Sequence, residues 1–362
     1  MSSDVLSLSL IEQAPKVLLH DHLDGGLRPS TIIELAKDCG YEGLPTKDPE
    51  ALRTWFIADE PNGDLVRYLA GFTHTTAVMQ TKSALARVAR ECAVDLARDG
   101  VVYAEIRFAP ELHTNEGLRP SDIVQAVLQG FKDGVEEARG EGNVIIIRTI
   151  LSAMRQAERS REIAALAVDF RDEGVCGFDI AGPEKGFPPT HHLEAFRILQ
   201  NADFHLTLHA GEAFGLPSIW EALQLCNAER LGHGVRIVDD ITWDKNEVRM
   251  GRLANYVRDR RVPLELCPTS NVHTGAVSAL HEHPIEKLRQ LKFRVTLNTD
   301  NRLMSGVSLS SEFDACATTF GWDLSIMEWL TLNAAKSAFY QFDHRLDLIN
   351  KVIKPGFAAL RN

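Results

Sequence analysis

The chain has 362 residues, enough for two ordinary domains or for one large α/β barrel. Its 44% hydrophobic and 25% charged residues are the proportions of a globular protein and exclude a disordered chain. A formal net charge of −11 without a dense basic stretch argues against nucleic-acid binding, and no apolar run approaches the roughly 20 residues that span a bilayer. We therefore expect neither a nucleic-acid partner nor a membrane partner.

The cysteines and the amino terminus indicate a cellular compartment. Six cysteines are scattered along the chain, and none forms a C-x-x-C pair. This pattern favours reduced thiols in the cytoplasm over a disulfide framework. No Lys or Arg precedes the short apolar stretch at the amino terminus, so we do not expect a secretory signal.

Short apolar runs supply the predicted strands. The first run is at 16–23, and from residue 100 onward further runs alternate with amphipathic stretches. Continuous apolar runs of this length are typical of strands buried on both faces of a parallel sheet. The eight predicted strands are 16–23, 101–108, 144–151, 175–181, 204–209, 230–234, 262–267 and 293–298.

Amphipathic segments fill most of the gaps between these strands. In 81–99, apolar residues recur at helical spacing and Gly100 follows as a stop. The other predicted helices are 160–173, 191–202, 218–228, 251–260 and 284–292. Strand–helix alternation predicts a parallel sheet, and eight units favour a closed (β/α)₈ TIM barrel over an open doubly wound sheet.

Two segments are additional to the eight strand–helix units of a minimal barrel. The first is an insertion at 41–80, after the first helix, with a predicted helix at 64–79. The second is the carboxyl-terminal region 308–362, with two predicted helices in 308–340. Because no Pro/Gly/Ser-rich linker, low-complexity tract or repeat divides the sequence, we expect one domain over 1–362.

Polar residues collect at the carboxyl ends of the predicted strands, which surround one mouth in a (β/α)₈ barrel. They include His20, His22, His209, Glu212, His233 and Asp300. Taken singly, most have a simple structural explanation: Glu212 suits the first turn of a helix, and Asp300 suits a cap. His233, between two glycines, is unusual for a packing residue. Together, three imidazoles and one carboxylate suit Zn²⁺ with a position left for water, whose pKa the ion can lower to about 7. By contrast, His281 and His283 are expected to be exposed at a helix start.

Five ordered motifs resemble the adenosine deaminase family of metal-dependent hydrolases. They are His-Asp-His-Leu-Asp-Gly at 20–25, Gly-Phe-Asp-Ile-Ala-Gly at 177–182, His-Ala-Gly-Glu at 209–212, Leu-Gly-His-Gly at 231–234 and Asn-Thr-Asp at 298–300. The resemblance extends from about residue 14 to about residue 340. It implies a barrel enzyme with one zinc ion that acts in purine salvage. The enzyme would hydrolyse adenosine, and also 2′-deoxyadenosine, to the corresponding inosine nucleoside and ammonia.

The resemblance also implies roles at the reaction centre. The zinc ligands, one ion per chain, would be His20, His22, His209 and Asp300. Glu212 would protonate purine N1 while hydroxide attacks C6. His233 would orient that hydroxide, and Asp300 would also act as a base. Since Glu212 must then be protonated, we expect burial to raise its pKa.

Substrate contacts follow from the same resemblance. Asp24, with His22 nearby, would contact the ribose, and the backbone N–H of Gly182 would meet purine N3. The family often has a second Asp that contacts N7, where this chain has Asn301. Because N7 is an acceptor and an Asn amide donates at every pH, we expect purine recognition to be retained.

Other readings remain open at this point. The same chemistry could act on free adenine, an adenosine nucleotide or 6-aminodeoxyfutalosine. A nucleotide is the weakest option because Asp24 would repel a 5′-phosphate, and with adenine Asp24 would lack a sugar partner. A catalytically silent barrel that binds purines or proteins is a different class, and the retention of Glu212 and His233 argues against it.

The sequence does not fit two other kinds of metal site. It also does not indicate an oligomeric state. A His/Cys/Cys deaminase site fails because no P-C-x-x-C motif exists. Two-metal relatives of the barrel that this chain resembles use a modified lysine at the end of the fourth strand; here that strand ends in Asp-Ile-Ala-Gly at 179–182, which favours one metal.

Overall fold

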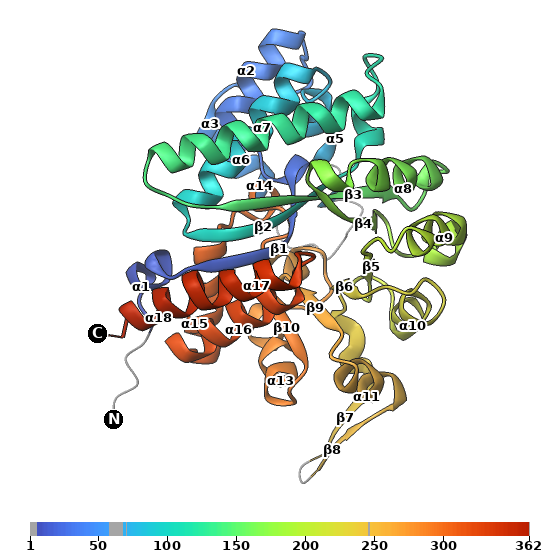
Figure 1. Cartoon of the computed structure of the whole chain (residues 1–362), viewed down its shortest axis with the longest axis vertical. Coiled ribbons are helices and arrows are strands. Elements are labelled where there is room, and N and C mark those ends of the chain that lie inside the picture. Colours follow the sequence, from blue (N-terminus) through green and yellow to red (C-terminus); the bar gives the residue numbers. More distant parts are fainter. Residues whose placement is uncertain (1–5, 58–67, 70, 245–246, 362) are drawn as a thin grey trace.

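Eight parallel strands form the centre of the molecule, a computed structural model that describes residues 6–57, 68–69, 71–244 and 247–361 (Figure 1). The strands are β1 (Lys16–His22), β2 (Val101–Phe108), β3 (Ile146–Met154), β4 (Val175–Ala181), β5 (Thr207–Ala210), β6 (Arg230–His233), β9 (Pro263–Leu266) and β10 (Arg294–Leu297). They pair as two four-stranded sheets, in the orders β1-β2-β3-β4 and β10-β9-β6-β5.

The two sheets close into one barrel through two isolated bridges. At one seam Asp21 pairs in parallel with Asp300, whose carbonyl accepts the His22 N–H at 2.7 Å. At the other seam Phe178 pairs with Leu206, and its N–H donates to the His205 carbonyl at 3.0 Å. The ring therefore runs from β1 to β4, then through β5, β6, β9 and β10 back to β1. This confirms the predicted (β/α)₈ fold.

The strand positions follow the apolar runs, with clear differences at β3 and at β5, which begins at Thr207 instead of residue 204. β4 is buried at every residue, as expected for a strand with a barrel interior on one side and helices on the other. The sequence predicts a strand at 144–151, whereas β3 extends to Met154. The extension arises because Ser152, Ala153 and Met154 pair with the last residues of β4, a long-range effect that an apolar run does not encode.

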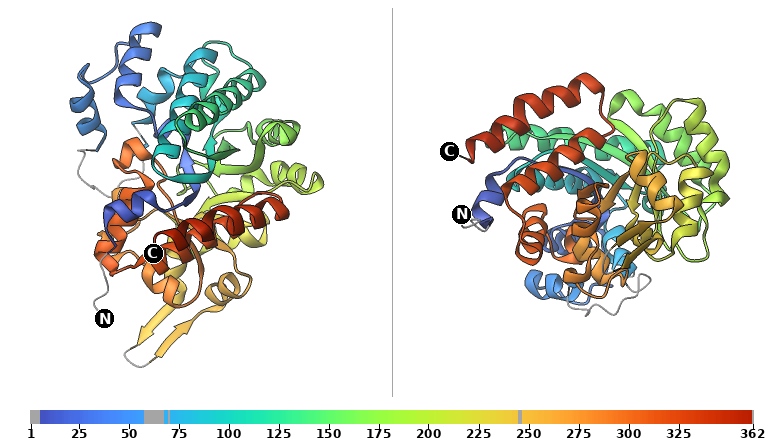
Figure 2. Two further views of the ribbon diagram at one scale, coloured as in Figure 1. Left: turned by 60° about the vertical axis from the view of Figure 1, so that its left-hand side comes forward. Right: turned by 90° about the horizontal axis from the view of Figure 1, so that it is seen from below.

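An antiparallel hairpin follows β6 and was not predicted. It comprises β7 (Ile241–Asp244) and β8 (Glu247–Met250), and it projects from the body of the molecule (Figures 1 and 2). Most of its described residues are exposed. With few buried apolar positions, the segment has no core-facing periodicity for sequence reasoning to detect.

Helices surround the strands in all three views (Figures 1 and 2). The helices that follow successive barrel strands are α6 (Lys82–Arg98), α7 (Pro120–Gly140), α8 (Ser160–Asp169), α9 (Leu193–Asn201), α10 (Leu216–Gln224), α11 (Arg252–Asp259), α13 (Ile285–Gln290) and α16 (Leu324–Ser337). In α6 the Thr81 side chain caps the start, and Gly100, with φ of 75°, lies just past the end as predicted. A Cβ on Gly100 would lie 2.6 Å from the Glu12 carbonyl oxygen, so both space and conformation require glycine there.

Further helices are additional to those of the eight strand–helix units. They are α1 (Leu8–Gln13), α2 (Pro29–Cys39), α3 (Pro49–Ile57), α5 (Phe72–Ala77), α12 (Pro268–His273), α14 (Arg302–Ser305), α15 (Leu309–Phe320), α17 (Phe342–Asp347) and α18 (Lys354–Ala359). α15 and α16 are the two helices predicted in 308–340. Of the predicted helix at 64–79, α5 lies within the described residues, whereas 64–67 and 70 lie outside them. Among the described helices, none is both long and apolar enough to cross a membrane.

Candidate metal and substrate site

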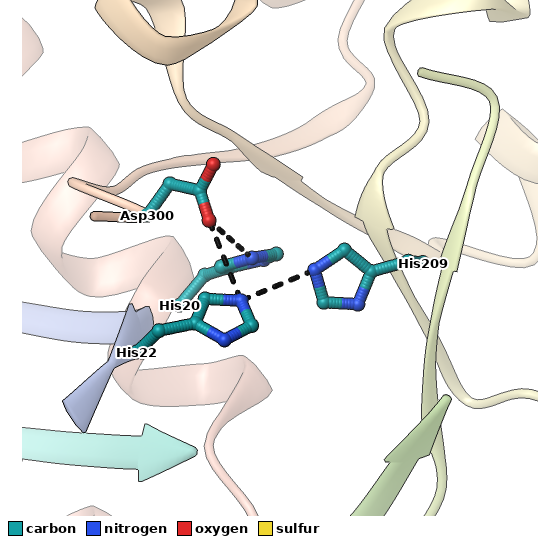
Figure 3. Close-up of side chains that lie close together, drawn as sticks. All are labelled: His20, His22, His209 and Asp300. Carbon is teal, nitrogen blue, oxygen red and sulfur yellow. Dashed lines mark hydrogen bonds and ion pairs between the residues drawn. The ribbon is translucent and has the colours of Figure 1, made fainter. Parts of the chain in front are cut away.

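Four of the predicted residues converge at the carboxyl end of the barrel (Figure 3). His20 and His22 come from β1, His209 from β5, and Asp300 lies just beyond β10. The Nε2 atoms of His22 and His209 are 3.3 Å apart. Asp300 Oδ1 lies 3.3 Å from His20 Nε2 and 3.4 Å from His22 Nε2. Ligand atoms about 2.0–2.1 Å from a tetrahedral ion are about 3.3 Å apart, so this spacing suits an ion of the size of zinc.

Two buried carboxylates orient the imidazoles. Glu265 Oε2 lies 3.0 Å from His20 Nδ1, and Asp179 Oδ1 lies 3.0 Å from His209 Nδ1. Each carboxylate accepts an Nδ1–H, which leaves the Nε2 lone pair facing the cluster. His20 Nε2 is buried without a hydrogen-bond partner among the described residues. Burial lowers the pKa of His20 to about 4, so its imidazole is neutral at pH 7 and the donor set fits a metal ion.

A network of buried charges supports this arrangement from inside the barrel. Glu265 is fully buried and pairs with Arg107 at 2.8 Å and Arg230 at 2.7 Å. Burial alone would raise the pKa of Glu265, but the two guanidinium groups hold it well below its usual range. Sequence reasoning missed Glu265. The available signal was a carboxylate within an otherwise apolar run, since such a group requires a partner when buried.

Glu212 and His233 lie beside the cluster, 3.6 Å apart between Oε2 and Nε2. The Thr274 hydroxyl donates to Glu212 Oε1 at 2.8 Å. Burial raises the pKa of Glu212; His233 opposes this effect and Asp300 adds to it. The direction is the one expected for a carboxylic acid that donates a proton.

The loop that carries Glu212 is held in place by hydrogen bonds to the carboxylate of Glu184. Four consecutive backbone N–H groups donate to its side chain, from Gly211 at 2.6 Å, Glu212 at 3.1 Å, Ala213 at 2.7 Å and Phe214 at 2.8 Å. A carboxylate bound by several amides fixes the backbone strongly because each hydrogen bond involves a charged acceptor. Sequence reasoning missed Glu184, although it follows the Gly-Phe-Asp-Ile-Ala-Gly motif by only two residues.

Two site residues have unusual backbone conformations. Asp300 has φ of 60° and His233 has φ of 62°, the left-handed region that non-glycine residues rarely occupy. Asp300 is held there by β1, because its N–H donates to the His20 carbonyl at 2.9 Å. Next to His233, a Cβ on Gly232 would lie 3.2 Å from His20 Cε1, so glycine makes room for the His20 ring.

A cavity of about 290 Å³ opens over the cluster, near the lower end of the usual range for small-molecule sites. Asp24, Gly182 and Asn301 line it together with Glu212, His233 and the proposed metal ligands other than His20. The 41–80 segment contributes Tyr68, Leu69, Phe72, Thr73 and Thr76. Burial raises the pKa of Asp24 to about 7, and neither Asp24 Oδ1 nor Asn301 Oδ1 has a hydrogen-bond partner within the described ranges. Both side chains are therefore available to a ligand.

The expectation that His283 is exposed is wrong, whereas His281 is exposed as expected. His283 is only 2% exposed, because it precedes α13 and its Nδ1 accepts the Ile285 N–H at 3.2 Å. Its Nε2 lies 3.2 Å from Asn271 Oδ1. A histidine that accepts a hydrogen bond from the first turn of a helix is thereby directed toward Asn271 instead of toward water.

Comparisons with known proteins identify a family profile, related sequences and similar solved structures. The family profile described as adenosine deaminase matches residues 15–355. A relative from Streptomyces coelicolor named adenosine deaminase 1 is 59% identical over 97% of this chain and 89% of its own. An adenosine deaminase from Mycobacteroides abscessus is 58% identical over 98% of both chains. Among solved structures, Arabidopsis ADAL complexed with IMP has a TM-score of 0.81 and 26% identity, with 96% of this chain and 98% of that one covered.

Proposed function

The chain belongs to the adenosine deaminase family, and we propose that it hydrolyses adenosine and 2′-deoxyadenosine to the corresponding inosine nucleoside and ammonia in purine salvage. The observation that carries this proposal is that a cluster of three histidines and one carboxylate lies next to a buried acid with a raised pKa, beside one cavity. Relatives that are 58–59% identical over nearly the whole chain are named for adenosine, which favours it over adenine or a nucleotide.

The metal in this proposal is one zinc ion per chain. Its ligands would be His20, His22, His209 and Asp300, whose ligand atoms all lie within 4.8 Å of one another. When bound, zinc supplies a nucleophilic oxygen at neutral pH by lowering the pKa of water.

The side chains around the ligands supply the proton transfers. Glu212, in its acid form, donates a proton to purine N1, which draws electrons from C6 and favours addition of water there. His233 orients the attacking water through Nε2, and Asp300 accepts a proton from it. The C6–N bond then breaks: the proton held by Asp300 passes to the leaving amine, which departs as ammonia, and the C6 hydroxyl proton returns to Glu212, which leaves the 6-oxo product.

Recognition of the nucleoside involves the remaining cavity residues. We assign the ribose to Asp24, with His22 nearby, purine N3 to the backbone N–H of Gly182, and N7 to Asn301. The insertion at 41–80 covers the pocket through its described residues, among them Tyr68 and Phe72, and we take residues 1–362 as a single barrel domain. All six cysteines are free thiols, which supports a cytoplasmic setting.

Ammonia release by zinc-quantified protein tests the proposal. We expect preference for adenosine and 2′-deoxyadenosine in a panel that also contains adenine, AMP and 6-aminodeoxyfutalosine. Glu212→Gln should abolish turnover and retain one zinc per chain, whereas the exposed Glu194→Gln should change neither.

Three outcomes would contradict the proposal. Near-normal turnover by Glu212→Gln would remove Glu212 from the mechanism. Preference for another compound of the panel would reject adenosine as the substrate. No release from any compound, with about one zinc per chain, would favour a silent barrel.

A further inference from the structure

A buried path of hydrogen bonds connects the start of α13 to His233. The path runs from the Ile285 backbone N–H through the side chains of His283 and Asn271. His283 and Asn271 are 2% and 0% exposed, and neither lines the cavity. Nothing in the proposed chemistry so far uses these two side chains.

The donor and the acceptor of the first hydrogen bond in this path are known, because a backbone N–H can only donate. His283 Nδ1 accepts the Ile285 N–H at 3.2 Å and therefore carries no proton. Burial, with His233 nearby, lowers the pKa of His283 to about 3, so the ring is neutral and its one proton is on Nε2. This Nε2–H donates to Asn271 Oδ1 at 3.2 Å.

The orientation of Asn271 follows from this contact. With Oδ1 facing His283, the amide nitrogen faces Glu212 Oε1 at 3.4 Å and His233 Nδ1 at 3.1 Å. An amide NH₂ group donates and does not accept, so His233 Nδ1 must be the acceptor. When the His233 ring carries one proton, that proton therefore lies on Nε2, the atom 3.6 Å from Glu212 Oε2.

We propose that His283 and Asn271 are positioning residues that fix His233 in its Nε2–H tautomer. The hydrogen bond made by one ring nitrogen determines which nitrogen carries the proton, as for metal-binding histidines. The consequence is that His233 presents a donor to the reaction centre and keeps its acceptor on the far side. The catalytic meaning of this tautomer rests on the proposed function, whereas the tautomer itself depends only on the hydrogen bonds.

Histidine ¹⁵N NMR of the zinc-loaded protein measures the tautomer directly, because protonated and unprotonated imidazole nitrogens resonate far apart. The His233 signals are assigned by their loss in His233→Asn. We expect the Nε2–H pattern in the wild-type protein. Asn271→Asp replaces the donor by a carboxylate and should move the His233 proton to Nδ1. It should also lower kcat about 100-fold, the upper end for residues that orient an active-site group.

His283 provides a second pair of variants. His283→Leu frees the Asn271 amide to rotate, so we expect mixed tautomers and kcat lowered about tenfold. His283→Gln retains an N–H donor near the Nε2 position and should restore the wild-type pattern and most of kcat. His281→Leu, an exposed position two residues away, is the matched control and should change neither property.

The outcomes separate this inference from the proposed function. A wild-type His233 protonated on Nδ1, or an unchanged pattern in both Asn271→Asp and His283→Leu, would overturn the inference whatever the activity. If the tautomers move as expected but the wild-type protein releases no ammonia from adenosine, the inference stands and the proposed function fails.

Discussion

The buried carboxylate of Glu265 gives the sharpest test of how the barrel interior supports the metal site. Glu265→Gln removes one negative charge at almost constant volume. In the folded protein that charge contacts Arg107 at 2.8 Å, Arg230 at 2.7 Å and His20 Nδ1 at 3.0 Å, with no exposure to water. The variant therefore changes the electrostatics of the core without creating a large cavity.

The expected loss of unfolding free energy depends on the buried arginine charges that remain after the substitution. Removing one partner of a buried ion pair costs about 3–5 kcal/mol because the other charge stays buried. Both arginines keep a second carboxylate, since Arg107 lies 3.4 Å from Asp179 and Arg230 lies 2.6 Å from Glu105. We therefore expect a loss near the lower end of this range, about 3 kcal/mol. Zinc affinity should also fall about 10–100-fold, because His20 loses its anionic acceptor.

Glu229→Gln is the matched control for this experiment. Glu229 lies 3.0 Å from His205 Nδ1, the same distance as between Glu265 and His20, but the two side chains are 46% and 49% exposed. An exposed pair contributes at most about 1 kcal/mol. Denaturant unfolding of the zinc-free variants measures the stability difference, and chelator competition measures zinc affinity. Equal losses for the two variants, or a loss below about 1 kcal/mol for Glu265→Gln, would refute the reasoning.

Four further predictions concern the metal, the Glu212 loop, the purine contact and pH. Zinc at 100 times its Kd should stabilise the fold by about 2.7 kcal/mol, seen as a raised unfolding midpoint, and chelation should abolish ammonia release; an unchanged midpoint would contradict a folded metal site. Glu184→Gln should lower kcat at least about tenfold, because the amide keeps one acceptor oxygen and its NH₂ group must face an N–H donor, so that at least one contact is lost and the others weaken, together by roughly 1.4 kcal/mol or more; activity equal to that of Glu194→Gln would contradict this. Asn301→Leu should raise KM for adenosine about tenfold if the amide contacts N7, and an unchanged KM would show that the contact is irrelevant. Because the pKa of His283 is lowered to about 3, folding favours its neutral form; its contribution is complete above about pH 6.5 and is lost as pH falls toward 3. The wild-type protein should lose about 1.6 kcal/mol more than His283→Gln between pH 6.5 and 5, measured by denaturant unfolding, and equal slopes would disprove the assignment.

Residues at predicted strand ends could be brought together from sequence because barrel closure is a topological consequence of eight strand–helix units. His20 and Asp300 are far apart along the chain, yet β1 and β10 adjoin once the ring closes. Apolar runs mark the strands and short polar motifs mark their ends, so the sequence alone determined the fold and placed the candidate ligands at one mouth. The metal cluster could therefore be predicted without knowledge of the side-chain geometry.

Only the tertiary structure decided which buried polar groups hold those ligands in place. Glu265, Glu184 and Asn271 contact partners between 12 and 245 residues away, and no local pattern distinguishes them from other polar residues next to apolar runs. The burial of His283 was missed for the same reason, since a histidine before a helix can face either water or the core. The physical cause is that a buried charge or imidazole is stable only with its partners, and closure of the barrel determines which partners it meets.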